Sequence, residues 1–198
     1  MNVLIVLAHP DHGSLNHAIA GAAAAALHEL GHAVVAHDLY AEKFDPVLSA
    51  AEIPRGATLP AALQRHCDEL ANADGIVVVH PNWWGQPPAV LKGWIDRVVR
   101  PGVAYAFEEG DGGEGVPLGL LRARTAVVLN TSNTPPDRER DVFGDPLDAI
   151  WKRCIFALCG VHDVRRRVFS VVATSTPQER DAWLREVEEI VCVAFPRR

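Results

Sequence analysis

The sequence of 198 residues has no apolar run near the roughly 18 residues that a membrane-spanning helix requires. Its start, MNVLIVLAHPDHG, has no basic segment before the apolar residues, which predicts a first strand and not a signal peptide. Basic residues are also fewer than acidic ones, 19 against 25, and the net charge of -6 disfavours a general nucleic-acid binder. We therefore expect a cytoplasmic protein with no inserted membrane segment and no nucleic-acid partner.

Cysteine is scarce and is not spaced for metal binding. The four cysteines form no CxxC pair, so we expect reduced structural thiols. Histidine is more frequent, with nine residues, and His9, His12 and His17 lie close together. Their surroundings are typical of a loop, however, and no acidic helix presents paired ligands at i and i+4. We therefore expect no metal site.

Apolar runs alternate with segments typical of helices along the whole chain. The expected strands are residues 3–8, 32–40, 75–80, 125–129 and 168–173, and the expected helices are 14–30, 60–72, a segment after Pro88, 146–159 and a last one from 177. Continuous apolar strands are typical of a parallel sheet covered on both faces. The pattern predicts one α/β domain over residues 1–198, a flavodoxin-like three-layer sandwich with five parallel strands in the order 2-1-3-4-5.

Smaller features add further expectations. Gly93 inside a helix costs about 1 kcal/mol relative to Ala, which indicates a close backbone approach to a ligand or another chain. The alternative is a surface glycine that the helix tolerates. Asp145 is expected to cap the helix that follows it. The basic triplet 165–167 is interpreted as a solvated segment leading into a strand, and 130–140 (NTSNTPPDRER) as a polar loop. The acidic, glycine-rich segment 108–115 (EEGDGGEG) is expected to be flexible or a flap.

Three polar loops are expected at the carboxyl ends of the strands, where ligands bind in such sheets. They are AHPDHGSLN after the first strand, HPNWWGQPP after the third and NTSNTPP after the fourth. The first has no GxGxxG fingerprint but leads into a helix N-terminus, which favours a phosphate. The alternative is that Ser14 only caps this helix.

The second loop holds two of the five tryptophans, although aromatic residues make up only 7% of the chain. Trp83 and Trp84 offer a flat apolar surface, and the third loop offers small hydrogen-bonding side chains. A ligand with a phosphate at one end and a planar ring at the other, such as flavin mononucleotide, would suit all three loops. The alternative is that both indoles pack under the edge of the sheet.

Three segments together resemble the NAD(P)H:quinone oxidoreductase family, to which DT-diaphorase and the ancillary proteins of bacterial potassium-efflux systems are related. They are LIVLAHPDHGSLNHAI, HPNWWGQPPAVLKGWIDRVVRPGVAYAF and FGDPLDAIW. The resemblance implies a homodimeric enzyme that passes a hydride from NAD(P)H through flavin N5 to a quinone or similar planar acceptor. The loop before the second helix is shorter than in members that bind FAD, which favours FMN, with FAD as the alternative.

The resemblance also implies roles for residues of this chain. The cofactor-binding residues would be His9, Ser14, Leu15, Asn16, Pro81, Asn82, Trp83, Trp84, Gly85, Thr131 and Ser132. Tyr105 and Phe107 would reach over the flavin of the partner subunit, and with Phe143 they would shape the substrate pocket.

One departure from the family pattern concerns the mechanism. Members of the family carry a Tyr and a His after the fourth strand that assist hydride transfer. The corresponding stretch here is PPDRERDVFGD, with Phe143 at the position of the His and no Tyr. We expect backbone N–H groups, Asn133 or Arg138 to balance the charge of the reduced flavin instead.

Two other functions remain open for such a chain. The first is a flavin-binding regulatory subunit that docks on a transporter such as a potassium-efflux system. The second is an electron carrier, which would not oxidise NADPH directly. Sequence does not separate the enzyme from the regulatory subunit, because the fold and the cofactor pocket serve both. The tryptophan loop, Tyr105 and the segment GDGGEG suggest a pocket for a small acceptor, which a carrier would not need.

Overall fold

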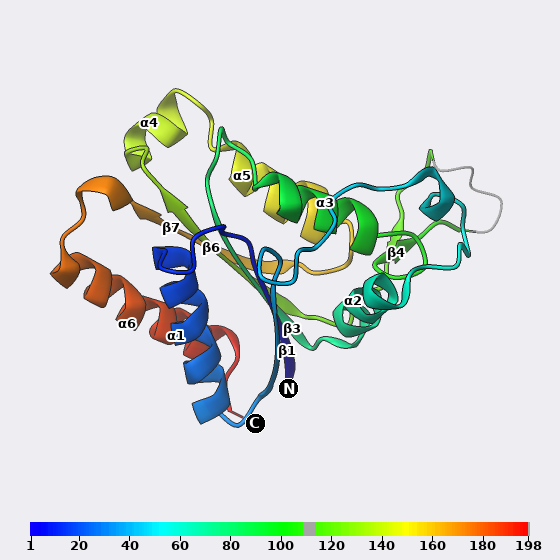
Figure 1. Ribbon diagram of the computed structural model, residues 1–198, viewed down its shortest axis with the longest axis horizontal. Helices are drawn as coiled ribbons and strands as arrows, with labels where there is room; N and C mark the ends of the chain where they lie inside the picture. The colour runs from blue at the N-terminus through cyan, green and yellow to red at the C-terminus, as the bar shows by residue number, and fades with distance from the viewer. Residues whose placement is uncertain (109–113, 198) are drawn as a thin grey trace.

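A parallel sheet of five strands forms the centre of the computed structural model, which describes residues 1–108 and 114–197 (Figure 1). The strands are β1 (Asn2–Leu7), β2 (Ala33–Asp38), β3 (Gly75–Pro81), β6 (Thr125–Ser132) and β7 (Asp163–Ser170). Their order across the sheet is β2-β1-β3-β6-β7. Counted along the chain this is the order 2-1-3-4-5, so the predicted flavodoxin-like topology is confirmed.

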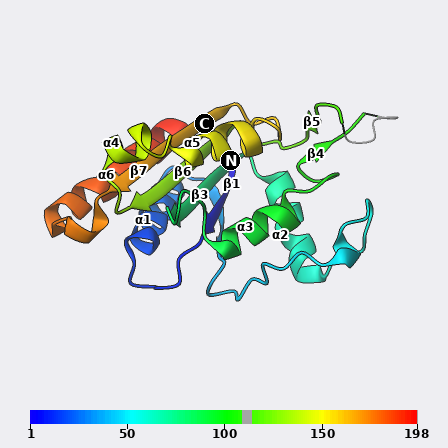
Figure 2. The same ribbon diagram turned by 90° about the horizontal axis from the view of Figure 1, so that it is seen from above.

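Helices cover both faces of the sheet, as Figures 1 and 2 show. One face carries α1 (Leu15–Glu29) and α6 (Pro177–Ala194), and the other carries α2 (Ala61–Asn72), α3 (Ala89–Val98) and α5 (Pro146–Ala149), which continues as a π-helix over Ile150–Phe156. Ser14 caps α1 through its side chain, and Thr176 and Glu179 form a capping box at the start of α6. No helix in the described part of the chain is long and apolar enough to span a bilayer.

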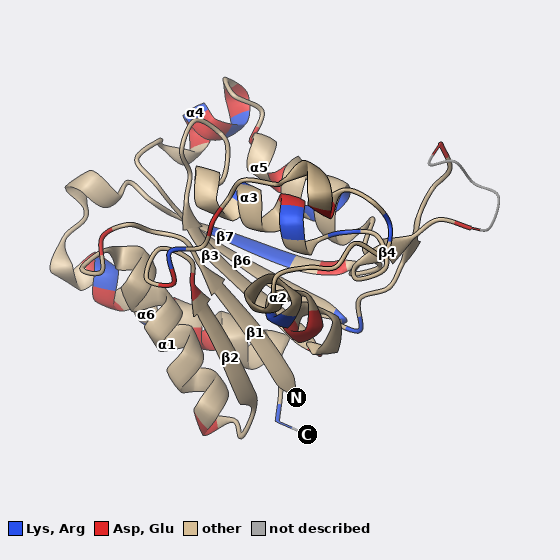
Figure 3. Ribbon diagram, turned by 45° about the vertical axis from the view of Figure 1, so that its right-hand side comes forward, with Lys and Arg blue, Asp and Glu red and all other residues tan. Residues whose placement is uncertain are grey.

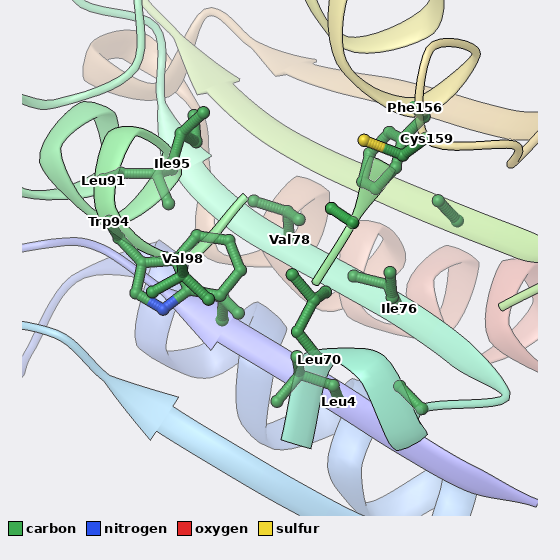
Figure 4. Packing of buried hydrophobic residues seen from close by; sticks show 14 of the residues in the cluster. Leu4, Leu70, Ile76, Val78, Leu91, Trp94, Ile95, Val98, Phe156 and Cys159 are labelled. Atoms are coloured by element: carbon green, nitrogen blue, oxygen red, sulfur yellow. The ribbon is translucent and has the colours of Figure 1, made fainter. Parts of the chain in front are cut away.

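Two apolar clusters hold the layers together. Alternate strand residues face opposite sides, so Leu4 and Val78 belong to the cluster under α2 and α3, whereas Ile5 and Val79 belong to the cluster under α1 and α6. Figure 4 shows the first cluster, in which Trp94 of α3 lies among the strand side chains. The central strands β1, β3 and β6 are therefore covered by helices on both faces, and their carboxyl ends are left open to a ligand.

A small antiparallel hairpin lies beside this sandwich. It pairs β4 (Tyr105–Ala106) with β5 (Leu118–Gly119) and projects away from the central sheet (Figures 1 and 2). Short 3₁₀ turns occur at Ala50–Glu52 and Val172–Thr174. Within the segment 108–115 that we expected to be flexible or a flap, residues 109–113 lie outside the described part of the chain.

The segment after the fourth strand of the sheet differs from the sequence prediction of one polar loop. Strand β6 runs on to Ser132, and a short helix α4 (Pro136–Asp141) follows it. The polar residues Thr131 and Ser132 therefore lie in a strand and are buried. Pro136 sits in the first turn of α4, where its missing N–H costs nothing.

The basic triplet 165–167 lies inside a strand and not ahead of one. β7 begins at Asp163, and the basic triplet forms its blue segment in Figure 3. The Arg166 side chain is only 3% exposed and pairs with Asp145 at 2.7 Å. Asp145 consequently does not cap α5 as predicted: its backbone is left-handed with φ 45°, and its carboxylate binds Arg166.

Gly93 does make the close approach that its helical position indicates, but the neighbour is a loop of the same chain. A Cβ added at Gly93 would lie 2.3 Å from the carbonyl oxygen of Pro46. The expected ligand or second chain at this point is therefore replaced by the segment between β2 and α2.

Candidate active site

The first loop presents a helix N-terminus at the edge of the sheet. Ser14 Oγ accepts a hydrogen bond from the backbone N–H of His17, and the first turn of α1 holds no acidic residue. The N–H groups of this turn therefore favour an anion. His9 belongs to this loop, and its Nδ1 accepts the Asp11 N–H at 3.1 Å. Burial lowers the pKa of His9, so this side chain offers a neutral ring at neutral pH.

Asn16 connects the first loop to the end of β6. Its Nδ2 donates to Thr131 Oγ1 at 2.9 Å, and the residue is 2% exposed. Its Oδ1 is buried and has no hydrogen-bond partner among the described residues. A buried acceptor left in this state is costly, typically by about 1–3 kcal/mol. The position is therefore suited to a ligand that carries a hydroxyl or N–H donor.

The tryptophan loop is a tight turn that holds its second indole out into solvent. Trp83 and Gln86 exchange backbone hydrogen bonds of 3.1 and 3.0 Å, and Trp84 and Gly85 between them have φ of 58° and 72°. Trp84 is fully exposed and Trp83 is 40% exposed. The alternative in which both indoles pack under the sheet is wrong. A bulky residue with positive φ is strained, which is common at ligand sites.

Two contacts fix this turn against its neighbours. The Asn82 N–H donates to the Thr131 carbonyl at 2.7 Å, and Asn82 Oδ1 accepts the Gly85 N–H at 2.9 Å. Gly85 in turn lies against Pro146 at the start of α5, where an added Cβ would come within 2.7 Å of the Pro146 ring. The loop is therefore held in position by both β6 and α5.

A cavity of about 510 Å³ opens beside the turn. Glu139 of α4 reaches it with a buried carboxyl group, and Oε1 has no hydrogen-bond partner in the described part of the chain. The carboxyl group is thus available to a ligand. The lining residues are Asn82, Trp84, Gly85, Thr134, Glu139, Phe143 and Pro146.

A buried polar network joins the carboxyl ends of β3 and β6 around His80. His80 Nδ1 donates to the Pro81 carbonyl at 2.8 Å, and its Nε2 accepts from Asn130 and Trp151 at 2.8 and 2.9 Å. Burial lowers the pKa of His80 to about 4, so the ring is neutral, as these partners require. Asn130 Oδ1 accepts from Arg166 Nε at 2.7 Å. The network fixes the ends of β3 and β6 in one arrangement.

Comparison with known proteins agrees with this geometry. A family model described as a flavodoxin-like fold matches residues 1–191. An uncharacterised NAD(P)H oxidoreductase of Haemophilus influenzae is 32% identical over 93% of this chain and 91% of its own. The structure of an NAD(P)H:quinone oxidoreductase from Methanothermobacter marburgensis superposes with a TM-score of 0.82 at 27% identity, covering 96% of this chain and 95% of that one. An FMN-dependent NADH:quinone oxidoreductase of Ruegeria pomeroyi is 31% identical over 52% of this chain and 49% of its own.

The chain belongs to the flavodoxin-like NAD(P)H:quinone oxidoreductase family. It is accordingly an oxidoreductase, and the carboxyl edge of its sheet is the candidate active site. Most of the residues that the family resemblance selected gather at this edge. They are His9, Ser14, Leu15, Asn16, Pro81, Asn82, Trp83, Trp84, Gly85, Thr131 and Ser132.

Four other residues that the sequence predicted for the site of this oxidoreductase do not line the cavity of about 510 Å³. Asn133 turns its Oδ1 to the Ala173 N–H at 2.8 Å, on the segment after β7. Arg138 is exposed and is not among the described residues that line the cavity. Tyr105 and Phe107 line a second cavity of about 370 Å³ at the hairpin, with their ring centroids 5.8 Å apart. Phe143, by contrast, lines the first cavity.

The sequence did not predict that Glu139 and Pro146 line the site, nor that His80 is the centre of a buried network. Glu139 lies one position after Arg138, and in a helix that shift turns the side chain by about 100°. The sequence prediction of a loop at 130–140 gave no such periodicity. For His80 a signal did exist, since a polar side chain at the end of an apolar strand needs buried partners.

Proposed function

We propose that the chain is a flavin-dependent NAD(P)H:quinone oxidoreductase with FMN as its cofactor. The observation that carries the proposal is the cavity beside the exposed Trp84. The buried Oδ1 of Asn16, which has no hydrogen-bond partner among the described residues, supports it. The cavity lies at the edge where ligands bind in parallel sheets. The FMN-dependent relative named above supports the choice of cofactor.

The residues present fit such a group. The N-terminus of α1, with Ser14, Leu15 and His9, would hold the phosphate. The free Oδ1 of Asn16 would accept a hydroxyl of the ribityl chain. The turn that contains Trp83 and Trp84, together with Thr131 and Ser132, would hold the ring. The remaining residues of this set, Pro81, Asn82 and Gly85, position the turn.

When bound, FMN supplies two-electron hydride chemistry between NAD(P)H and a planar acceptor such as a quinone. The chain's own part is to orient this group and to exclude water from it. Phe143 and Trp84 present apolar surface to a planar substrate. Glu139 holds a carboxyl group at the same cavity, and its unpartnered oxygen makes it a better candidate than Asn133 or Arg138 for holding a proton there.

A homodimer is part of the proposal. Tyr105 and Phe107 are carried on a hairpin that projects from the sandwich, about a cavity separate from that of Glu139. In a dimer this hairpin would complete the substrate pocket of the other copy. A cytoplasmic location follows from the proposed use of NAD(P)H. A regulatory role beside a transporter uses the same pocket and differs only in its partner.

The deciding experiment is the visible spectrum of the purified protein, followed by chromatography of the ligand released by heat. We expect the bands of an oxidised flavin and release of FMN. Release of FAD would keep the enzyme class and overturn the choice of cofactor. A protein that stays colourless and cannot be reconstituted with either flavin would overturn the proposal.

Turnover then separates the candidate functions. We expect NADPH or NADH oxidation with a quinone, and ping-pong kinetics because donor and acceptor use one pocket in turn. Asn16→Ala should weaken FMN binding at least tenfold, whereas Asn72→Ala, on an exposed face of α2, should not. A flavin-loaded protein that oxidises neither nucleotide would indicate an electron carrier or a regulatory subunit.

A further inference from the structure

Three metal-ligating side chains converge at the mouth of the β1–α1 loop. His12 comes from the loop, His17 from the first turn of α1 and Asp38 from the last position of β2. One ligand atom from each lies within 4.8 Å of the other two. Asp38 Oδ2 lies 2.9 Å from His17 Nε2 and 3.6 Å from His12 Nδ1. The three residues are brought together by three separate elements of the fold.

These separations match the size of a tetrahedral metal site. Ligand atoms about 2.0–2.1 Å from Zn²⁺ in a tetrahedron lie about 3.3 Å apart. The distances from Asp38 Oδ2 to the two imidazole nitrogens, 2.9 and 3.6 Å, bracket this value. Two imidazoles and one carboxylate form a nitrogen and oxygen donor set that suits Zn²⁺ and its neighbours among the divalent transition metals.

Two of the three ligands are also oriented by outer partners, as is usual at metal sites. Asp38 Oδ1 accepts the backbone N–H groups of Tyr40 and Ala41 at 3.1 Å each, which leaves Oδ2 to face the histidines. His17 Nδ1 lies 3.0 Å from Ser14 Oγ, and an N–H donated to this hydroxyl would turn the lone pair of Nε2 toward Asp38 Oδ2, where the ion would lie.

A second cluster of the same composition offers a comparison. His37 and His66 also lie near a carboxylate, that of Glu42. However, His37 uses both ring nitrogens, with Glu42 at 2.7 Å and Glu69 at 2.5 Å. His66 Nδ1 accepts the Trp94 N–H at 3.3 Å, so its proton is on the nitrogen that faces Glu42. His37 therefore lies between two carboxylates, whereas the second partner of His17 is a hydroxyl, which can accept the Nδ1 proton and leave Nε2 for an ion.

We propose that His12, His17 and Asp38 bind one divalent transition metal ion of the Zn²⁺ type, with its fourth position open to solvent. The His12 side chain is 70% exposed, which leaves that side of the site accessible. A bound ion ties the β1–α1 loop to α1 and to β2. The expectation of no metal site rested on spacing along the chain, and Asp38, 21 residues after His17, was not part of that reasoning.

The test is titration of the untagged, EDTA-treated full chain with ZnCl₂, using a chromophoric chelator as competitor, with and without added FMN. We expect one ion per chain. His12→Ala should lower the affinity at least tenfold, and because His12 is exposed the variant should stay folded. His28→Ala, an exposed histidine at the other end of α1, is the matched control and should leave the affinity unchanged.

Cobalt gives an independent spectroscopic readout, because Co²⁺ d–d bands report the ligand set. We expect visible bands that Asp38→Asn weakens and that show no thiolate charge transfer. A thiolate band would place the ion on Cys154 or Cys192, which are the exposed cysteines, and would overturn the proposal. Affinity that falls with His66→Gln but not with His12→Ala, or no Zn²⁺ binding at micromolar concentration, would overturn it as well. None of these readouts depends on flavin or turnover.

Discussion

Gly85 lies directly against Pro146, and a Cβ added to it would approach the proline ring to 2.7 Å. Gly85 belongs to the tryptophan turn after β3, and Pro146 starts α5, so this contact connects two elements that are far apart in the sequence. The contact also needs positive φ, which is 72° at Gly85. The turn that carries Trp84 is thus held by a position that only glycine fills without strain.

Gly85→Ala tests whether this contact positions a ligand site. We expect the dissociation constant for FMN, measured by fluorescence quenching, to rise at least tenfold because the turn must move off Pro146. Gly31→Ala is the matched control: Gly31 also has positive φ, 79°, but no described atom lies within 4 Å of its added Cβ. Equal FMN affinity in the two variants would contradict the prediction.

Glu139→Gln tests the carboxyl group at the cavity, with Arg138→Ala as its neighbour on the same helix. We expect kcat with NAD(P)H and a quinone to fall about tenfold or more in Glu139→Gln, and its pH dependence to flatten, because a positioned acid or base typically contributes at least that much. Arg138→Ala should stay within twofold, since its side chain is exposed. The opposite pattern would favour the original prediction for Arg138.

Gly93→Ala tests the contact with Pro46. The added methyl group meets the Pro46 backbone, so we expect the free energy of unfolding in urea to fall by about 1–3 kcal/mol. Gly21→Ala is the control within α1, where no described atom lies within 4 Å of the added Cβ. There the better helix propensity of Ala should stabilise the protein by up to about 1 kcal/mol. Effects of the same sign in both variants would contradict the proposed role of Pro46.

Sequence periodicity predicted the strand order and the edge that carries the loops, because both depend on local apolar pattern and general topology. It could not identify Pro46 as the neighbour of Gly93, since that contact joins a loop to a helix more than 40 residues away. Arg166 shows the same limit. A basic triplet is normally solvated, and its middle member is buried here because Asp145 and Asn130 accept its hydrogen bonds, which the sequence does not show.

In the candidate site, too, the sequence predicted the features that depend on local signals and missed those that depend on the three-dimensional arrangement. Ser14 and the tryptophan pair were found because a cap and a loop aromatic are local signals. Glu139 was missed because the choice between it and Arg138 depends on a six-residue helix. The polar sequence of this helix has no apolar periodicity from which it could be predicted.

Arg166→Met tests the buried pair with Asp145. The Arg166 side chain is 3% exposed, and removal of its guanidinium group leaves the Asp145 carboxylate and Asn130 Oδ1 without their donor. We expect a loss of about 3–5 kcal/mol in the free energy of unfolding. Arg165→Met is the control, because the Arg165 side chain is 37% exposed in its pair with Asp163, and surface pairs contribute about 1 kcal/mol or less. Similar losses in the two variants would show that Arg166 is no more than a surface residue.

The free energy of unfolding should also decrease as pH is lowered, in two separate pH ranges. Burial lowers the pKa of His66 and of His80 to about 4, from an ordinary value of 6.5. Between these values the unfolded chain binds more protons than the folded one, so the free energy of unfolding decreases as pH falls from 6.5 to 4, by up to about 1.4 kcal/mol per pH unit for each histidine. Stability from these groups is complete above pH 6.5.

The carboxylates act at lower pH. The hydrogen bond from Arg97 lowers the pKa of Glu52, so its contribution is complete above the unfolded value near 4.5 and is lost as pH falls further. Urea unfolding from pH 8 to pH 4 should therefore already show the histidine slope before Glu52 titrates. His66→Gln should reduce that slope by about one proton, whereas His28→Gln, at an exposed site, should leave it unchanged. A His80 imidazole that titrates near 6.5 by NMR would contradict its place in the network with Asn130 and Trp151, because a protonated ring has no acceptor for their N–H groups.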